Sequence, residues 1–215
     1  ESSLKCAYKH INKIGWKPII SELGHFETAP EYIQPLVSSI KPHLDNDSHL
    51  LFSYHGLPIS HVKRSDVNKN HCQKVNNCCS ISTESNKSCY AHHCMMTTFA
   101  AVDSLNLGIE DWSISYQSRL GPVKWLTPST LSKVEELANK GVKKLVIVSP
   151  AFVADGLETL EELDIEIREH FIKCGGEEMR VVNCLNDDPA WISGLSKLIQ
   201  SSFAAINEER LPLAL

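Results

Sequence analysis

The stretch Lys143-Lys-Leu-Val-Ile-Val-Ser-Pro150, followed by Ala-Phe-Val-Ala-Asp-Gly-Leu-Glu158-Thr-Leu-Glu-Glu162-Leu-Asp-Ile-Glu166, decides the fold. Its first part is a short apolar run typical of a buried strand, and its second part has the pattern of a helix. Glu158, Glu162 and Glu166 are spaced four residues apart, so in a helix they form one slanting row. Like charges in such a row repel each other, which favours bound cations or protons there. The plain alternative is a solvated acidic helix start, which the helix dipole favours.

The composition is that of a globular protein with one α/β domain, or one domain with an appendage. Of its 215 residues, 42% are hydrophobic and 22% are charged, which is ordinary for a chain with a buried core. The net charge of −5 argues against nucleic acid as a bulk partner. No apolar run approaches the roughly 18 residues of a membrane span, and we recognise no signal peptide.

Short apolar runs alternate with helical patterns along the chain, which predicts an open, Rossmann-like parallel sheet flanked by helices. The predicted strands lie at residues 17–22, 49–54, 112–117, 143–149 and 179–185. The predicted helices lie at residues 2–15, 29–43, 90–105, 128–140, 157–174 and 189–205. Glycines at 141, 175 and 176 stand where helices should end.

Polar side chains follow several of these strands, at the edge where ligands of parallel sheets bind. His55 follows one strand, Arg119 and Trp125 follow another, and Glu158 follows a third. An imidazole opposite a carboxylate row can remove protons or pass on a divalent cation. Arg119 can pair with a ligand carboxylate or cap a turn. Trp125 can stack on a flat ligand or pack in the core.

Three long motifs carry a resemblance to a known family. They are Leu51-Phe-Ser-Tyr-His-Gly-Leu-Pro58, Tyr116-Gln-Ser-Arg-Leu-Gly-Pro-Val-Lys-Trp-Leu126 and Pro150-Ala-Phe-Val-Ala-Asp-Gly-Leu-Glu-Thr-Leu-Glu-Glu-Leu-Asp164. In this order they closely resemble ferrochelatase, the enzyme that inserts ferrous iron into protoporphyrin to form haem. The resemblance implies a chelatase-type fold, with His55 and Glu158 as the catalytic pair. It also implies that Glu162 and Glu166 form a metal or proton path, on a helix that often has a π-type distortion, and that Trp125 walls the porphyrin pocket.

The resemblance also implies that this chain is the C-terminal portion of such an enzyme. Residues 1–16 resemble the end of an N-terminal domain, and residues 17–215 resemble the C-terminal domain. Without the N-terminal half we expect an open cleft and little activity. Coproporphyrin ferrochelatase and a non-catalytic porphyrin or iron–sulfur binding fragment are the alternatives. We expect a cytoplasmic location, and leave open a peripheral association with the inner face of the membrane. Gly156 stands where many relatives carry His or Cys.

A polar segment at residues 65–89 interrupts the alternation of strands and helices and has no counterpart in most ferrochelatases. It contains four of the chain's eight cysteines, and a fifth follows in the next helix. Four thiolates can hold a 2Fe-2S cluster or a tetrahedral zinc. The family resemblance favours the cluster, with ligands Cys72, Cys79, Cys89 and Cys94, and Cys78 as a substitute. The remaining cysteines, Cys6, Cys174 and Cys184, are predicted to pack as small apolar residues.

Overall fold

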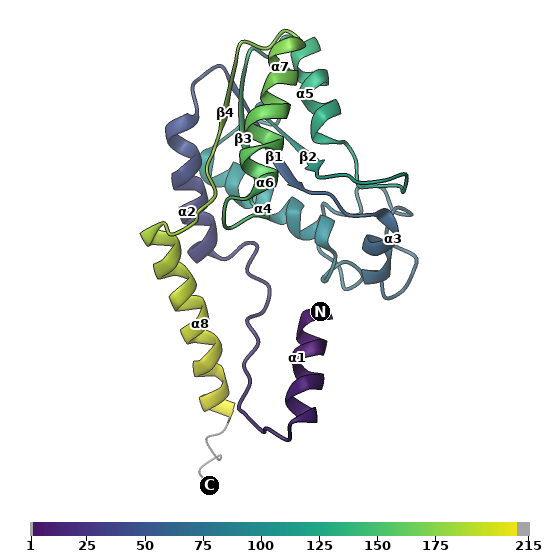
Figure 1. The fold of residues 1–215 in the computed structure, drawn as a ribbon, viewed down its shortest axis with the longest axis vertical. Helices are drawn as coiled ribbons and strands as arrows, with labels where there is room; N and C mark the ends of the chain where they lie inside the picture. The colour runs from purple at the N-terminus through teal and green to yellow at the C-terminus, as the bar shows by residue number, and fades with distance from the viewer. Residues whose placement is uncertain (1, 210–215) are drawn as a thin grey trace. The chain divides into compact units, whose positions relative to one another are not determined.

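The computed structural model describes residues 2–209, which form two compact units. The smaller unit contains residues 2–25 and the chain from Ser196 onward, and the larger unit spans Phe26–Leu195. In the smaller unit, helix α1 spans Ser2–Lys13, and the final part of helix α8 (Pro189–Glu209) follows later in the chain (Figure 1). The predicted strand at residues 17–22 is wrong, because this segment has no strand pairing in the described part of the chain. Its Ser21 hydroxyl instead donates to the Ser202 carbonyl at 2.9 Å.

The larger unit is built on a parallel sheet, as the sequence predicts. Its strands are β1 (Ser48–His55), β2 (Trp112–Gln117), β3 (Lys144–Val148) and β4 (Glu178–Val181). Their order is β2-β1-β3-β4, and every neighbouring pair is parallel. The carboxyl ends of the strands therefore share one edge, where His55 of β1 is opposite Gln117 of β2.

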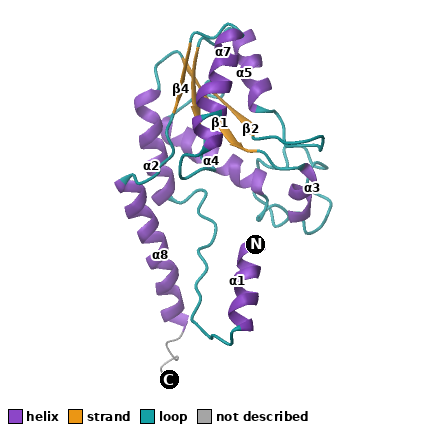
Figure 2. Ribbon diagram, in the orientation of Figure 1, coloured by secondary structure: helices purple, strands orange, loops and turns teal. Residues whose placement is uncertain are grey.

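Helices cover both faces of this sheet (Figure 2). They are α2 (Pro30–Ile40), α3 (Ile59–Val62), α4 (Tyr90–Leu105), α5 (Thr130–Asn139), α6 (Leu157–Leu160), a π-helix (Glu162–Ile167), α7 (Arg168–Lys173) and the start of α8, with short 3-10 turns at Lys41–His43 and Lys63–Ser65. The predicted helices thus form close to the expected bounds. The π-helix falls within the helix for which the family resemblance implied such a distortion.

Alternation along the central strand divides the core into two clusters. Successive strand side chains point to opposite faces, so Leu50, Phe52 and Tyr54 of β1 pack with α2 and α4, whereas Leu51 packs with α5 and α7. All four side chains are almost completely buried. Burying each apolar side chain contributes about 1.5–3 kcal/mol, which fixes the register of β1 and hence the place of His55. Among the described residues, no helix combines the length and apolar character of a membrane span.

Candidate active site at the carboxyl edge of the sheet

His55 is the last residue of β1 and is half-buried at the carboxyl edge of the sheet. Its ring stands edge-on to Phe152, with ring centroids 5.9 Å apart. The Nδ1 atom is buried and has no hydrogen-bonding partner among the described residues. The backbone carbonyl of His55 accepts a hydrogen bond from the Tyr90 hydroxyl at 2.9 Å. The backbone of His55 is therefore fixed, while its buried Nδ1 is left without a hydrogen-bonding partner among the described residues.

Gly56 lets the chain pass closely beside β2. Its N–H donates to the Gln117 carbonyl at 2.8 Å. A Cβ atom at this position would lie 2.6 Å from the same oxygen and 3.5 Å from the Trp125 ring. Only glycine fits without a shift of the backbone, which explains why it follows His55 directly.

The acidic row predicted from the sequence lines an open pocket of about 540 Å³. Glu158 stands on α6, and Glu162 and Glu166 stand on the π-helix that follows. The Glu166 N–H bonds to the carbonyl of Glu161, five residues earlier, so the backbone is widened at this point. The structure thus brings the three carboxylates to one pocket, whereas His55 lies outside its lining.

Glu162 is held by the loop that follows β2. The Ser118 backbone N–H and hydroxyl donate to its two carboxylate oxygens at 2.7 and 2.8 Å. Ser118 takes a positive φ of 58°, which turns both donors toward the helix. Glu162 is therefore fixed in orientation. Glu166 is exposed at the outer end of the row.

Gln117 joins the strands to the acidic helix, although nothing in its sequence context predicts this role. Its side chain is almost completely buried. Its amide N–H donates to the Glu158 carbonyl at 2.7 Å, and its amide oxygen accepts from Ser53 at 2.7 Å and Ser149 at 3.3 Å. This residue connects β1, β2, β3 and α6 at the edge where His55 ends. A buried amide of this kind can be recognised only once its partners are known.

A second network fixes the loop before Glu158. The Asp155 carboxylate accepts from the Thr159 hydroxyl, the Cys184 N–H and the Asn186 amide, at 3.0, 3.1 and 2.7 Å. Burial by itself would raise the pKa of Asp155, but these hydrogen bonds outweigh it and the pKa is lowered. The carboxylate is therefore charged at neutral pH and ties the loop after β3 to the segment after β4.

Arg119 and Trp125 both lie at this edge. Arg119 lines the acidic pocket, and its guanidinium donates to the Leu126 carbonyl at 2.6 Å, so it caps the turn. Trp125 is half-buried and its backbone bridges to Pro58. Its indole Nε1 is buried and has no partner among the described residues. Arg119 therefore borders the acidic pocket, whereas Trp125 is not part of its lining.

Four cysteines of the polar segment at residues 65–89, called the insertion below, gather around one small cavity. Cys72, Cys78 and Cys89 line a space of about 10 Å³, and the Cys79 thiol lies 3.7 Å from that of Cys78. A hydrogen bond from the Cys79 thiol lowers the pKa of Cys89, and the same bond raises the pKa of Cys79. The lowered pKa favours the thiolate form of Cys89, which is the form that binds metals.

The fifth cysteine of this region has a different environment. Cys94 is buried within α4, and burial raises the pKa of its thiol. A hydrogen bond joins it to the Tyr90 hydroxyl, and it does not line the cavity formed by the other cysteines.

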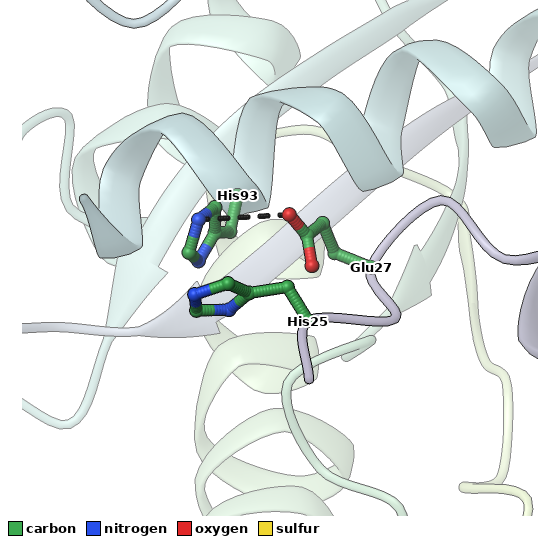
Figure 3. A group of neighbouring side chains, drawn as sticks. All are labelled: His25, Glu27 and His93. Atoms are coloured by element: carbon green, nitrogen blue, oxygen red, sulfur yellow. Dashed lines mark ion pairs between the residues drawn. The ribbon is translucent and has the colours of Figure 1, made fainter. Parts of the chain in front are cut away.

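Histidines and acidic side chains fasten the insertion to the domain. His71 bonds to the Cys78 carbonyl at 2.9 Å, and His92 bonds to the Cys79 carbonyl at 2.8 Å. His93 lies 3.5 Å from the Glu27 carboxylate, next to the start of α2 (Figure 3). His71 and His92 thus bond to the backbone of the insertion, and His93 lies beside the Glu27 side chain.

Buried Asp66 organises the start of the insertion. One carboxylate oxygen of Asp66 accepts the N–H groups of His71 and Cys72, both at 2.8 Å. These bonds, led by that from Cys72, lower the pKa of Asp66. The charged carboxylate therefore fixes the backbone that carries the first thiol of the group.

Together the sheet and its edge define an α/β protein with an acidic pocket beside a strand-terminal histidine. Comparison with known proteins then gives the family. The sequence model of the ferrochelatase family matches residues 1–203. The chain is 44% identical over 198 residues to a ferrochelatase of Pseudomonas fluorescens (strain Pf0-1), covering 91% of this chain and 55% of that protein. It is 42% identical over 188 residues to a ferrochelatase of Ectopseudomonas mendocina (strain ymp), covering 86% and 55% respectively.

A ferrochelatase of Pseudomonas aeruginosa (strain LESB58) is similar at 41% identity over 180 residues, covering 83% of this chain and 53% of that protein. The chain belongs to the ferrochelatase family, as its motifs predict. It spans about half the length of the curated relatives it matches.

Proposed function

We propose that this chain forms the catalytic C-terminal half of a ferrochelatase that inserts ferrous iron into protoporphyrin IX. The observation that carries this proposal is the pocket of Glu158, Glu162 and Glu166 at the same sheet edge as His55. The ferrochelatase relatives support iron as the substrate metal. The proposed product of this site is haem.

The residues of the edge suit the two demands of metallation. Two pyrrole protons must leave the porphyrin while a cation that has lost its water enters the ring face. The imidazole of His55, half-buried at the sheet edge, is proposed to accept one proton, and Glu158 to take the second or guide the cation. Glu162 and Glu166 then continue the row from the pocket toward solvent. We propose that Arg119 binds a propionate and that Trp125 contacts a ring face of the porphyrin.

We further propose that the activity needs a second part of the protein. Because the chain spans about half the length of its relatives, the remaining half would complete the porphyrin pocket. Residues 1–16 are proposed as the end of that N-terminal domain, and residues 17–215 as the C-terminal domain. The pocket at the edge is open, which agrees with a missing wall.

An anaerobic assay of haem formation from ferrous iron and protoporphyrin IX tests this proposal. We expect rapid metallation by the complete gene product and weak or absent metallation by the 215-residue chain. Coproporphyrin in the same assay distinguishes the alternative substrate, which should react more slowly. Porphyrin binding without metallation by the complete gene product would instead support a binding role and reject the catalytic one.

The cysteine cavity is proposed as a second centre, which binds a 2Fe-2S cluster. The thiols of Cys72, Cys78, Cys79 and Cys89 fit this group by their chemistry, since they are four soft ligands and the pKa of Cys89 is lowered. Their arrangement favours Cys78 over Cys94 as the fourth ligand. The cavity of about 10 Å³ is closer in size to a single ion than to a cluster, so zinc is the alternative, and either group requires the thiols to rearrange. When bound, either zinc or a cluster would stabilise the loop at residues 65–89, and a cluster would also make it sensitive to redox conditions.

Metal analysis of the anaerobically purified protein decides between these centres. A cluster gives red-brown protein with about two irons and two sulfides per chain, whereas zinc gives colourless protein with about one metal ion. Cys78→Ser should strongly reduce the metal content per chain, and Cys94→Ser should leave the metal content unchanged. The opposite pattern would restore Cys94 as the ligand, and metal-free wild-type protein would reject both centres.

We propose that the protein acts in the cytoplasm, with peripheral association at the inner face of the membrane. Exposed apolar side chains near the acidic pocket, Leu120, Leu157 and Leu160, support such an association. Fractionation of cells that express the complete gene product tests it. Recovery in the membrane fraction, released by salt or carbonate, is the expected result.

A further inference from the structure

A second group of metal-ligating side chains lies on α5 and α7, outside the acidic pocket and the cysteine cavity. The Nε2 atom of His170 lies 3.6 Å from the thiol of Cys174 and 3.8 Å from the carboxylate of Glu135. His170 and Cys174 are one helical turn apart, and Glu135 comes from α5, which packs beside α7 (Figure 1). The sequence predicts Cys174 only as a small packing residue, but its thiol has a specific neighbour.

The geometry favours a cation over a proton relay. A Cys–His–Glu relay would use the two ring nitrogens for different partners, whereas here the thiol and the carboxylate both approach Nε2. In a tetrahedral zinc site with metal–sulfur and metal–nitrogen bonds of about 2.3 and 2.0–2.1 Å, neighbouring ligand atoms are separated by about 3.3–3.6 Å. The thiol contact of 3.6 Å falls at the upper end of this range and the carboxylate contact of 3.8 Å lies just beyond it, whereas the thiol and the carboxylate are not within 4.8 Å of each other. We propose that Glu135, His170 and Cys174 bind a divalent cation of the zinc class.

The burial of the three side chains suits a site that can be loaded from solvent. The His170 side chain is 29% exposed and is held against α5, whereas the Glu135 side chain is 56% exposed. Closing the site requires the Glu135 carboxylate to turn toward Cys174, which an exposed glutamate does readily. A water molecule would occupy the fourth position, as in open zinc sites.

The proposed cation site continues the row of acidic side chains that begins at Glu158. Glu158, Glu162, Glu166, His170 and Cys174 follow one another at four-residue spacing. Because α7 runs back along the parallel sheet, Cys174 lies toward the edge opposite His55. The proposed cation site therefore shares no residue with the proposed metallation site, and it does not depend on the proposed metallation of porphyrin.

Residue-specific alkylation of the reduced 215-residue chain, read by peptide mass spectrometry, tests this site. With Zn²⁺ at about ten times its Kd, mass action leaves about one tenth of the thiol free, so alkylation of Cys174 should slow about tenfold. Exposed Cys6 serves as the internal control, and its rate should not change. Reading Cys174 separately keeps the result independent of zinc bound by the cysteines of the insertion.

Variants make the test specific to the three proposed ligands. His170→Ala should abolish the protection of Cys174, and Glu135→Gln should weaken it. Glu136→Gln is the matched control, because Glu136 pairs with Lys133 and Lys140 instead. Absence of protection in the wild type, or equal protection in His170→Ala, would overturn the proposal. Thermal unfolding of each variant checks that its fold is intact.

Discussion

Replacing Gln117 with leucine tests whether this buried amide holds the site together. The change keeps a side chain of similar size but removes three hydrogen bonds, to Glu158, Ser53 and Ser149. A buried hydrogen bond contributes about 1 kcal/mol net, so the variant should lose about 3 kcal/mol of unfolding free energy. For a chain of this size, that loss lowers Tm by about 6–12 °C.

Urea unfolding followed by far-ultraviolet circular dichroism measures this difference. Gln200→Leu is the matched control, because Gln200 is exposed on α8 and donates only to Ser196. Its free energy of unfolding should stay within about 0.5 kcal/mol of the wild type. A loss of less than about 1 kcal/mol for Gln117→Leu would refute the view that this network fixes Glu158.

Three further predictions address the same edge. Gly56→Ala should cost about 1–3 kcal/mol in urea unfolding, because its Cβ would press on the Gln117 carbonyl; unchanged stability would contradict the close approach. Tyr90→Phe should cost about 0.5–1.5 kcal/mol, because it removes the donor to the His55 carbonyl, and no loss would mean that this bond is dispensable. Asp155 has a lowered pKa in the folded protein. Its contribution to the free energy of unfolding is therefore complete above about pH 4 and declines as the pH falls through the pKa of the folded state. The difference in unfolding free energy between wild type and Asp155→Asn should therefore shrink at acid pH, and a difference that grows there would contradict the sign.

Much of the fold could be predicted because short apolar runs alternate with long amphipathic patterns. The strand at residues 112–117 and the helix at 90–105 form with the predicted bounds. The run at residues 17–22 has similar composition but includes Pro18, which cannot donate to a sheet ladder. In the structure, Ile19 and Ile20 remain exposed, so local pattern alone could not decide whether this segment pairs.

The site could be predicted in part, because its residues follow strands or share a helix. His55 and the three glutamates are predicted this way, and the structure brings the glutamates to one pocket. Gln117 was missed because its role depends on partners from three other elements. The choice among cysteines also needs tertiary information, since sequence spacing does not show that Cys94 is buried and lies outside the lining of the cysteine cavity.

The rate of ferrous iron insertion by variants of the complete gene product tests the central claim most directly. His55→Ala and Glu158→Gln should each nearly abolish haem formation, because they remove the proton acceptor and the carboxylate at the sheet edge. His61→Ala and Glu169→Gln, at exposed positions of α3 and α7, should retain wild-type rates. Unchanged turnover in either His55→Ala or Glu158→Gln, with the fold intact by circular dichroism, would contradict the catalytic assignment.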